Sequence, residues 1–167
     1  MAGYGTDGAF ATWATANGYA LPDGAPSVAV LRQRGSAYLD ALYGAKVNAP
    51  RFSGQPTGGF AQERAWPRTG AEAYGAAIPS DIVPVAIEQA SYFAAWHEAN
   101  NPGSLSASAT QAGALKRKKI DTIEKEYFEG SGDAAADATV RLSLVDGILA
   151  PYLRQVNGPC LGLWAVG

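Results

Sequence analysis

Residues 84–100 read PVAIEQASYFAAWHEAN, and this stretch decides the fold because it has the strongest helical pattern in the chain. Pro84 suits the first turn of a helix. The run Asn100-Asn101-Pro102-Gly103 then stops the helix. An apolar stripe follows the helical spacing, formed by Val83, Ile87, Ala90, Phe93 and Ala94. Because alanines let another element come near, the pattern predicts a helix from about Pro84 to Asn100 that packs closely against a neighbour.

Two further helices are expected before this one. Thr6 can cap a first helix that Gly18 closes, and Ser27 can cap a second helix that Gly44 ends. Gly35 lies inside the second helix, where glycine lowers helix stability. This glycine is therefore either a weak point or a position where another backbone comes close.

The C-terminal part of the chain is expected to hold one more helix and one ambiguous segment. The last helix should run from about Thr139 to Gln155, with a kink or a restart at Pro151. Residues 115–128 have apolar residues at helical spacing, but their β-branched side chains also suit an exposed strand. The sequence leaves helix and strand open for this segment.

These patterns predict a mainly α chain: a small helical bundle with a long ordered loop and a short β element near residues 115–128. The length of 167 residues fits one domain, expected over residues 1–156, with a separate tail at 157–167. The chain has 33 alanines and 20 glycines, against only 32 residues of Val, Ile, Leu and Phe together. Because burial stabilises in proportion to apolar area, we expect a thin core and a subunit that completes its burial against partners.

A long segment from about residue 45 to residue 80 has no lasting periodicity and many turn-forming residues. Loops of this length are unusual in compact domains and are commonly functional. Its aromatic residues and prolines favour an ordered, extended path. The block Trp66-Pro67-Arg68 is predicted to brace this loop and to contact a neighbouring element or subunit, since a guanidinium forms planar, bidentate contacts.

The composition argues against most chemistry. With a single cysteine, Cys160, and a single histidine, His97, the chain cannot form an internal disulfide or a Cys/His zinc site. No nucleophile–base pair is apparent beside His97, and the glycines at 54–59 lack the ending of a phosphate loop. We therefore expect no catalytic residue, no cofactor and no metal. We also expect no membrane span and no signal peptide.

The only cluster of like charges is Lys116-Arg117-Lys118-Lys119. It could meet nucleic-acid phosphates, or it could be the solvated edge of a strand, where lysines discourage edge pairing. The acidic residues Glu124, Glu126 and Glu129 follow closely, and the chain has a net charge of -2. This balance favours charge contacts that register neighbouring subunits, or a channel lining, over a single-strand groove.

The C-terminal tail, residues 157–167, is apolar and has no charged side chain. Such a tail is unexpected on a free monomer. We expect it to dock on a partner or an adjacent subunit through its large apolar residues, Leu161, Leu163 and Trp164.

Several blocks in order resemble a known family of tailed-phage proteins. They are Phe52-Ser53-Gly54, the segment Ala65 to Gly70, the Ile-Pro and Val-Pro pairs at 78–84, the segment 115–127, and Leu149 to Leu153. This order is similar to that of proteins labelled DnaT-like single-stranded-DNA-binding proteins. It is also similar to that of head–tail connector (adaptor) proteins of siphophages and gene transfer agents. The resemblance covers residues 6 to 155.

The resemblance implies a mainly α-helical structural subunit of the virion neck, made in the host cytoplasm. It implies a ring, commonly of twelve copies, that lies beneath the portal protein and extends the channel through which double-stranded DNA passes. The other partner would be the next neck or tail-completion protein. The alternative reading is a replication accessory protein that binds single-stranded DNA.

Overall fold

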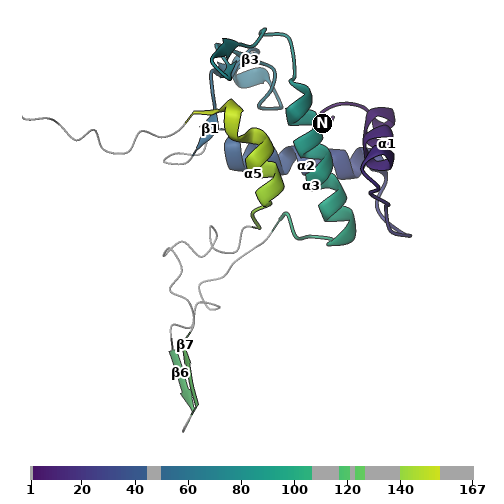
Figure 1. The fold of residues 1–167 in the computed structure, drawn as a ribbon, viewed down its shortest axis with the longest axis vertical. Helices are drawn as coiled ribbons and strands as arrows, with labels where there is room; N and C mark the ends of the chain where they lie inside the picture. The colour runs from purple at the N-terminus through teal and green to yellow at the C-terminus, as the bar shows by residue number, and fades with distance from the viewer. Residues whose placement is uncertain (1, 45–49, 107–116, 121–122, 127–139, 155–167) are drawn as a thin grey trace, which may run out of the picture.

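The computed structural model describes residues 2–44, 50–106, 117–120, 123–126 and 140–154 (Figure 1). The chain is mainly α with short β elements, as the sequence predicts. Its helices are α1 (Asp7–Ala16), α2 (Val28–Tyr43), α3 (Val85–Asn100) and α5 (Ser143–Leu149), with 3-10 turns η1 (Gly59–Ala61) and η3 (Ala150–Tyr152). No helix in the described ranges is long and apolar enough to cross a membrane.

Helices α2 and α3 come close together at Gly35. A Cβ atom at this position would lie 2.3 Å from the carbonyl oxygen of Ser91 and 2.7 Å from the amide nitrogen of Ala95. Both of those residues are buried on α3. Of the two explanations for Gly35, the close approach of another backbone is therefore confirmed.

Helix α1 packs on the α2–α3 pair largely through aromatic rings. Phe10 meets Tyr92 of α3 edge to face, with ring centroids 5.5 Å apart and planes at 89°. Tyr19 stacks on Trp96 at a centroid distance of 4.4 Å. Aromatic side chains carry large apolar areas, so a few rings replace the many aliphatic residues that this chain lacks.

Helix α1 begins as predicted, because the Thr6 hydroxyl accepts a hydrogen bond from the amide of Ala9 at 3.1 Å. Ser27 precedes α2 as predicted, but its side chain makes no capping hydrogen bond. Helix α3 matches the predicted range almost to the residue.

The last helix is shorter than predicted, and the expected range from Thr139 to Gln155 is wrong. Residues 140–142 lie outside the helix, where the Tyr38 hydroxyl donates to the Val140 carbonyl at 2.9 Å and accepts from the Leu142 amide at 3.3 Å. After Leu149 the chain passes through the 3-10 turn that contains Pro151. It then forms strand β8 (Leu153–Arg154).

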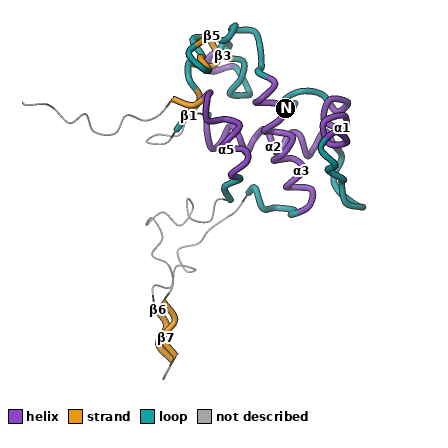
Figure 2. The backbone as a smooth tube through the Cα atoms, in the orientation of Figure 1, coloured by secondary structure: helices purple, strands orange, loops and turns teal. Residues whose placement is uncertain are grey.

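The ambiguous segment near residues 115–128 contains strands. β6 (Arg117–Ile120) and β7 (Ile123–Glu126) pair antiparallel, with Arg117 opposite Glu126 and Lys119 opposite Glu124. The helical alternative is therefore wrong for these eight residues, which Figure 2 draws as two orange strands. The tail at 157–167 lies outside the described residues.

We predict that Gly35→Ala destabilises the protein by about 1–3 kcal/mol, because the added methyl overpacks the α2–α3 contact and outweighs the gain in helix propensity. The matched control is Gly147→Ala in α5, where an added Cβ meets nothing within 4 Å. The control should raise stability by about 0.5–1 kcal/mol. Urea unfolding measures both variants, and a Gly35→Ala protein as stable as the control would contradict the close contact.

Candidate interaction surface

Residues 50–84 form an ordered loop held by pairs of two-residue strands. β1 (Arg51–Phe52) pairs with β8, β2 (Gln55–Pro56) with β3 (Arg68–Thr69), and β4 (Glu72–Ala73) with β5 (Ala76–Ala77), all antiparallel. The first of these pairs joins the loop to the C-terminal strand. Figure 1 shows these strands gathered beside the ends of α3 and α5.

Arg68 braces this loop from inside. Its guanidinium donates to three main-chain carbonyls: Ser53 at 2.7 Å, Gly54 at 2.7 Å and Ala65 at 2.9 Å. The residue is only 3% exposed, and burial lowers the pKa of its guanidinium. Because one planar guanidinium satisfies all three carbonyls, it joins the segment at Ser53 and Gly54 to the segment at Ala65.

Trp66 and Pro67 complete this brace. Trp66 is 2% exposed and meets Phe52 edge to face, with ring centroids 5.6 Å apart. The Trp66–Pro67 peptide bond is cis, and Pro67 is half-buried. The predicted block Trp66-Pro67-Arg68 thus lies together inside the loop, and this chain's own residues cover both large side chains. Contact of this block with another subunit stays a prediction.

Asp40 on α2 is the second anchor of the loop. Its carboxylate accepts hydrogen bonds from the Tyr4 hydroxyl at 2.5 Å and the Ala65 amide at 3.3 Å, and it pairs with Arg64 at 3.2 Å. The Tyr4 hydroxyl in turn accepts from the Trp66 amide at 3.2 Å. Burial raises the pKa of the Asp40 carboxyl despite these partners. One carboxylate therefore ties the N-terminal segment and the loop to α2.

Two other arginines are also used within the chain. The Arg32 guanidinium donates to the carbonyls of Gly3, Tyr4 and Gly5 and pairs with Asp7. Arg34 on α2 pairs with Glu98 on α3 at 3.1 Å. Because these cations are occupied by internal partners, they do not form a basic groove.

The rigid loop exposes two aromatic side chains at its tips. Phe60, in η1, is 106% exposed relative to its reference area, and Tyr74, between β4 and β5, is 84% exposed. Tyr74 also has a positive φ of 52°, which is uncommon for a residue other than glycine. The loop therefore holds two large rings in water on a braced backbone.

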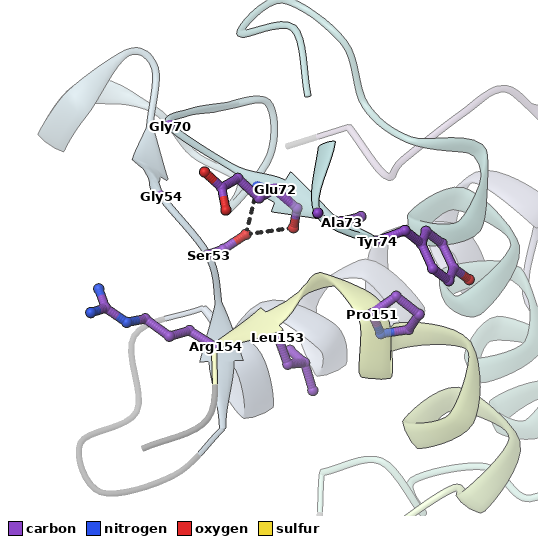
Figure 3. A pocket seen from close by; sticks show the side chains of 10 residues that line it. Ser53, Gly54, Gly70, Glu72, Ala73, Tyr74, Pro151, Leu153 and Arg154 are labelled. Atoms are coloured by element: carbon purple, nitrogen blue, oxygen red, sulfur yellow. Dashed lines mark hydrogen bonds between the residues drawn. The ribbon is translucent and has the colours of Figure 1, made fainter. Parts of the chain in front are cut away.

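A cleft of about 480 Å³ lies between the loop and the C-terminal strand (Figure 3). The Ser53 hydroxyl on its wall donates to the Glu72 carbonyl and accepts from the Glu72 amide, each at 3.0 Å. Figure 3 shows Arg154 and Tyr74 at opposite ends of the cleft, with Leu153 and Pro151 between them. Sequence reasoning did not single out this cleft, because its walls come from segments about 80 residues apart.

The structure describes only some of the other residues that the sequence analysis singled out. Arg117, Lys118 and Lys119 lie on β6. Lys116 and Cys160 fall outside the described residues. So do the predicted tail contacts, which are Leu161, Leu163 and Trp164. In the described part of the chain, no group of three or more His, Cys, Asp or Glu side chains is arranged to hold a metal.

His97 has a hydroxyl neighbour that the sequence did not reveal. Its Nδ1 lies 3.2 Å from the Ser104 Oγ in the turn that follows α3. Within the described ranges, no other side chain hydrogen-bonds to the imidazole, so the third group that orients a catalytic histidine is missing from this pair. The contact closes the end of α3.

The comparison with protein families assigns the chain to a family. The sequence model of the family described as "Putative DnaT-like ssDNA binding protein" matches residues 3–166. The chain belongs to this family. No curated protein and no solved structure matches it. The family match spans the helices, the braced loop and the β6–β7 hairpin of this DnaT-like protein, so all these elements are parts of one family unit.

We predict that Arg68→Lys destabilises the DnaT-like protein by about 2–4 kcal/mol, because an ammonium cannot reach three carbonyls and leaves buried acceptors unsatisfied. Arg141→Lys is the control, since the Arg141 side chain is 53% exposed and its pair with Asp146 is long at 3.4 Å. That change should cost less than about 0.5 kcal/mol. Equal unfolding midpoints for the two variants would show that Arg68 is not the brace.

Asp40 should give stability a defined pH dependence. The folded state holds the Asp40 proton to higher pH than the unfolded chain, whose carboxyl has a pKa of 3.8. The free-energy difference between wild type and Asp40→Asn should therefore fall as pH rises above 3.8, and become constant above the raised pKa. Urea unfolding from acidic to neutral pH measures this difference. An increase with pH would mean that the folded protein favours the ionised carboxylate.

Proposed function

We propose that this DnaT-like protein is a structural head–tail connector (adaptor) of a tailed bacteriophage or gene transfer agent. In this proposal, copies form a ring under the portal protein, commonly of twelve, in the virion neck. The ring extends the channel for double-stranded DNA and joins the head to the next neck or tail-completion protein. The observation that carries the proposal is the pair of exposed rings, Phe60 and Tyr74, on a loop that Arg68 holds rigid.

A rigid loop with exposed aromatic tips suits contact with another protein. Moving an exposed apolar side chain out of water is favourable. Covering one such ring with a partner stabilises the complex by about 2 kcal/mol. Aromatic residues are enriched at protein interfaces. Because the Arg68 and Asp40 networks already fix the loop, docking its tips costs little additional ordering entropy. A heterologous contact of this kind that closes on itself makes a ring.

The charge distribution supports a structural role. Arg32 and Arg34 of α2 and Arg64 of the loop each pair with a carboxylate of this chain. On the hairpin, the register places two of the basic positions opposite acidic ones. Opposite charges at facing positions of the two strands make this hairpin poorly suited to a uniformly basic groove.

The family description favours a second candidate function. It names single-stranded DNA binding for this family, and a replication accessory protein would use such an activity. The basic positions on β6 would then contact phosphates. This candidate requires an affinity that falls steeply with salt and that depends on Lys118 and Lys119.

Sedimentation velocity of the full chain, alone and with the portal ring encoded in the same genome, tests the connector proposal. We expect one large assembly, and we expect Phe60→Ser/Tyr74→Ser to lose it while keeping the wild-type unfolding midpoint. The control is Leu144→Ser, an exposed apolar change on α5 outside the loop, which should assemble normally. A wild-type chain that stays monomeric with and without the portal ring would overturn the proposal.

A further inference from the structure

Two exposed arginines face each other on the β1–β8 strand pair. In the register of this pair, Arg51 is opposite Arg154, and Phe52 is opposite Leu153. Phe52 is 1% exposed and lies in the core. Because successive side chains of a strand point to opposite faces, Arg51 and Arg154 project together from the outer face, and both are exposed.

This arginine pair is electrostatically unfavourable in the isolated chain. Directly opposed residues of an antiparallel pair have Cβ atoms about 5 Å apart, and like charges in that position destabilise the sheet. In the part of the chain that the structure describes, neither Arg51 nor Arg154 has a carboxylate within ion-pair distance, whereas arginines of α2 and of the loop do. A carboxylate placed between the two guanidiniums would remove their repulsion.

The cleft that adjoins the arginine pair has an apolar part beyond the cation. Arg154 lies at one end of the cleft and Tyr74 at the other, with Leu153 and Pro151 between them (Figure 3). Leu153 and Pro151 are only half-buried, so part of their apolar surface is open to a ligand. The cleft therefore suits a ligand that has a negative charge at one end and apolar groups after it.

The segment that enters α3 has this complementary pattern. Asp81 is exposed, and none of the ion pairs among the described residues includes it. Two exposed apolar residues follow, since Ile82 is 48% exposed and Val85 is 65% exposed. The Thr57 hydroxyl donates to the Ser80 carbonyl at 2.7 Å and so ties this segment to the loop.

The arginine pair and the segment from Asp81 to Val85 lie on different sides of the molecule. Figure 1 shows β1 on one side of the strands of the loop and the start of α3 on the other. A copy that uses its arginine pair to hold one neighbour therefore keeps its own segment available for another neighbour. Such a contact is heterologous, and it repeats from copy to copy.

We propose that the arginine pair and the adjoining cleft bind the segment from Asp81 to Val85 of a second copy of this chain. The Asp81 carboxylate lies between the two guanidiniums and accepts charge-assisted hydrogen bonds from them. Ile82 and Val85 cover the apolar wall of the cleft and the Tyr74 ring. Since the contact joins neighbouring copies of the ring, it rests on the proposed function.

The cleft favours this segment over a polyanion. Glu72 is exposed on the cleft wall, and its charge opposes any chain that carries a negative charge on every unit. The segment from Asp81 to Val85 has one carboxylate, so its uncharged residues can lie beside Glu72. Both surfaces are also ordered in advance, the cleft by Arg68 and the segment by Thr57, so docking costs little conformational entropy.

The test is sedimentation velocity of the full chain over a range of protein and NaCl concentrations. The wild-type chain should self-associate, and its association should weaken as salt screens the charges. Arg51→Gln/Arg154→Gln and Asp81→Asn should each weaken association by about tenfold or more. Because the double arginine variant removes a like-charge repulsion, its unfolding midpoint should equal or exceed that of wild type.

An equimolar mixture of these two variants tests the pairing itself. The double arginine variant keeps its Asp81 carboxylate, and the Asp81→Asn variant keeps its arginine pair, so the mixture can form one wild-type contact. At concentrations where each variant alone is monomeric, we expect a 1:1 complex. The complex should grow no further at higher concentration, because both of its remaining surfaces are altered.

Two matched variants control for the loss of a charge elsewhere on the surface. Arg141→Gln removes an exposed arginine that pairs with Asp146. Asp23→Asn removes an exposed carboxylate in the turn before α2. Both variants should associate as the wild-type chain does.

Two results would overturn the proposed contact and leave the connector proposal intact. They are equal association of the wild-type chain and the double arginine variant, and a mixture of variants that stays monomeric while the wild-type chain associates. If the double arginine variant associated normally but lost affinity for a thymidine oligonucleotide, the arginine pair would bind phosphates instead. A wild-type chain that stays monomeric with and without the portal ring would overturn both proposals. A 1:1 complex of the mixed variants without assembly on the portal would support the contact and count against the connector role alone.

Discussion

The backbone contact at Gly35 is the constraint on which the rest of the structure depends. A side chain there would meet the Ser91 carbonyl and the Ala95 amide, so α2 and α3 can touch only because one helix has a glycine and the other has small residues. This close pair gives α1 and α5 their packing surfaces. It also fixes the position of Asp40 on α2. The loop between the two helices is then anchored to this closely packed helix pair.

A chain with few aliphatic residues needs other means to order a long loop. Here buried polar groups supply them: Arg68 satisfies three carbonyls, and Asp40 joins Tyr4, Arg64 and the Ala65 amide. Such networks stabilise only when every member has a partner. The result is a loop with a rigid interior and exposed tips. That division suits a subunit whose remaining apolar surface is covered by other proteins.

Local patterns were enough to predict the helices, because caps, glycines and apolar spacing act within a few residues. Thr6 caps α1, Gly35 allows a close contact, and the 84–100 stretch forms α3. The last helix was predicted too long, because a helical pattern cannot show that the distant Tyr38 hydroxyl binds the backbone of Val140 and Leu142 just before the helix. Sequence reasoning did not single out Asp40, because its partners lie in distant segments of the chain. Arg51 and Arg154 are about a hundred residues apart, so only the β1–β8 register brings them together.

The central claim is that this DnaT-like protein is a building block whose copies complete one another's burial. Electron microscopy of the purified full chain at high concentration, alone and on the portal ring encoded in the same genome, tests it most directly. The account predicts closed rings with a central opening, stacked on the portal where portal is present. Separate single copies that ignore the portal and coat single-stranded DNA would contradict it.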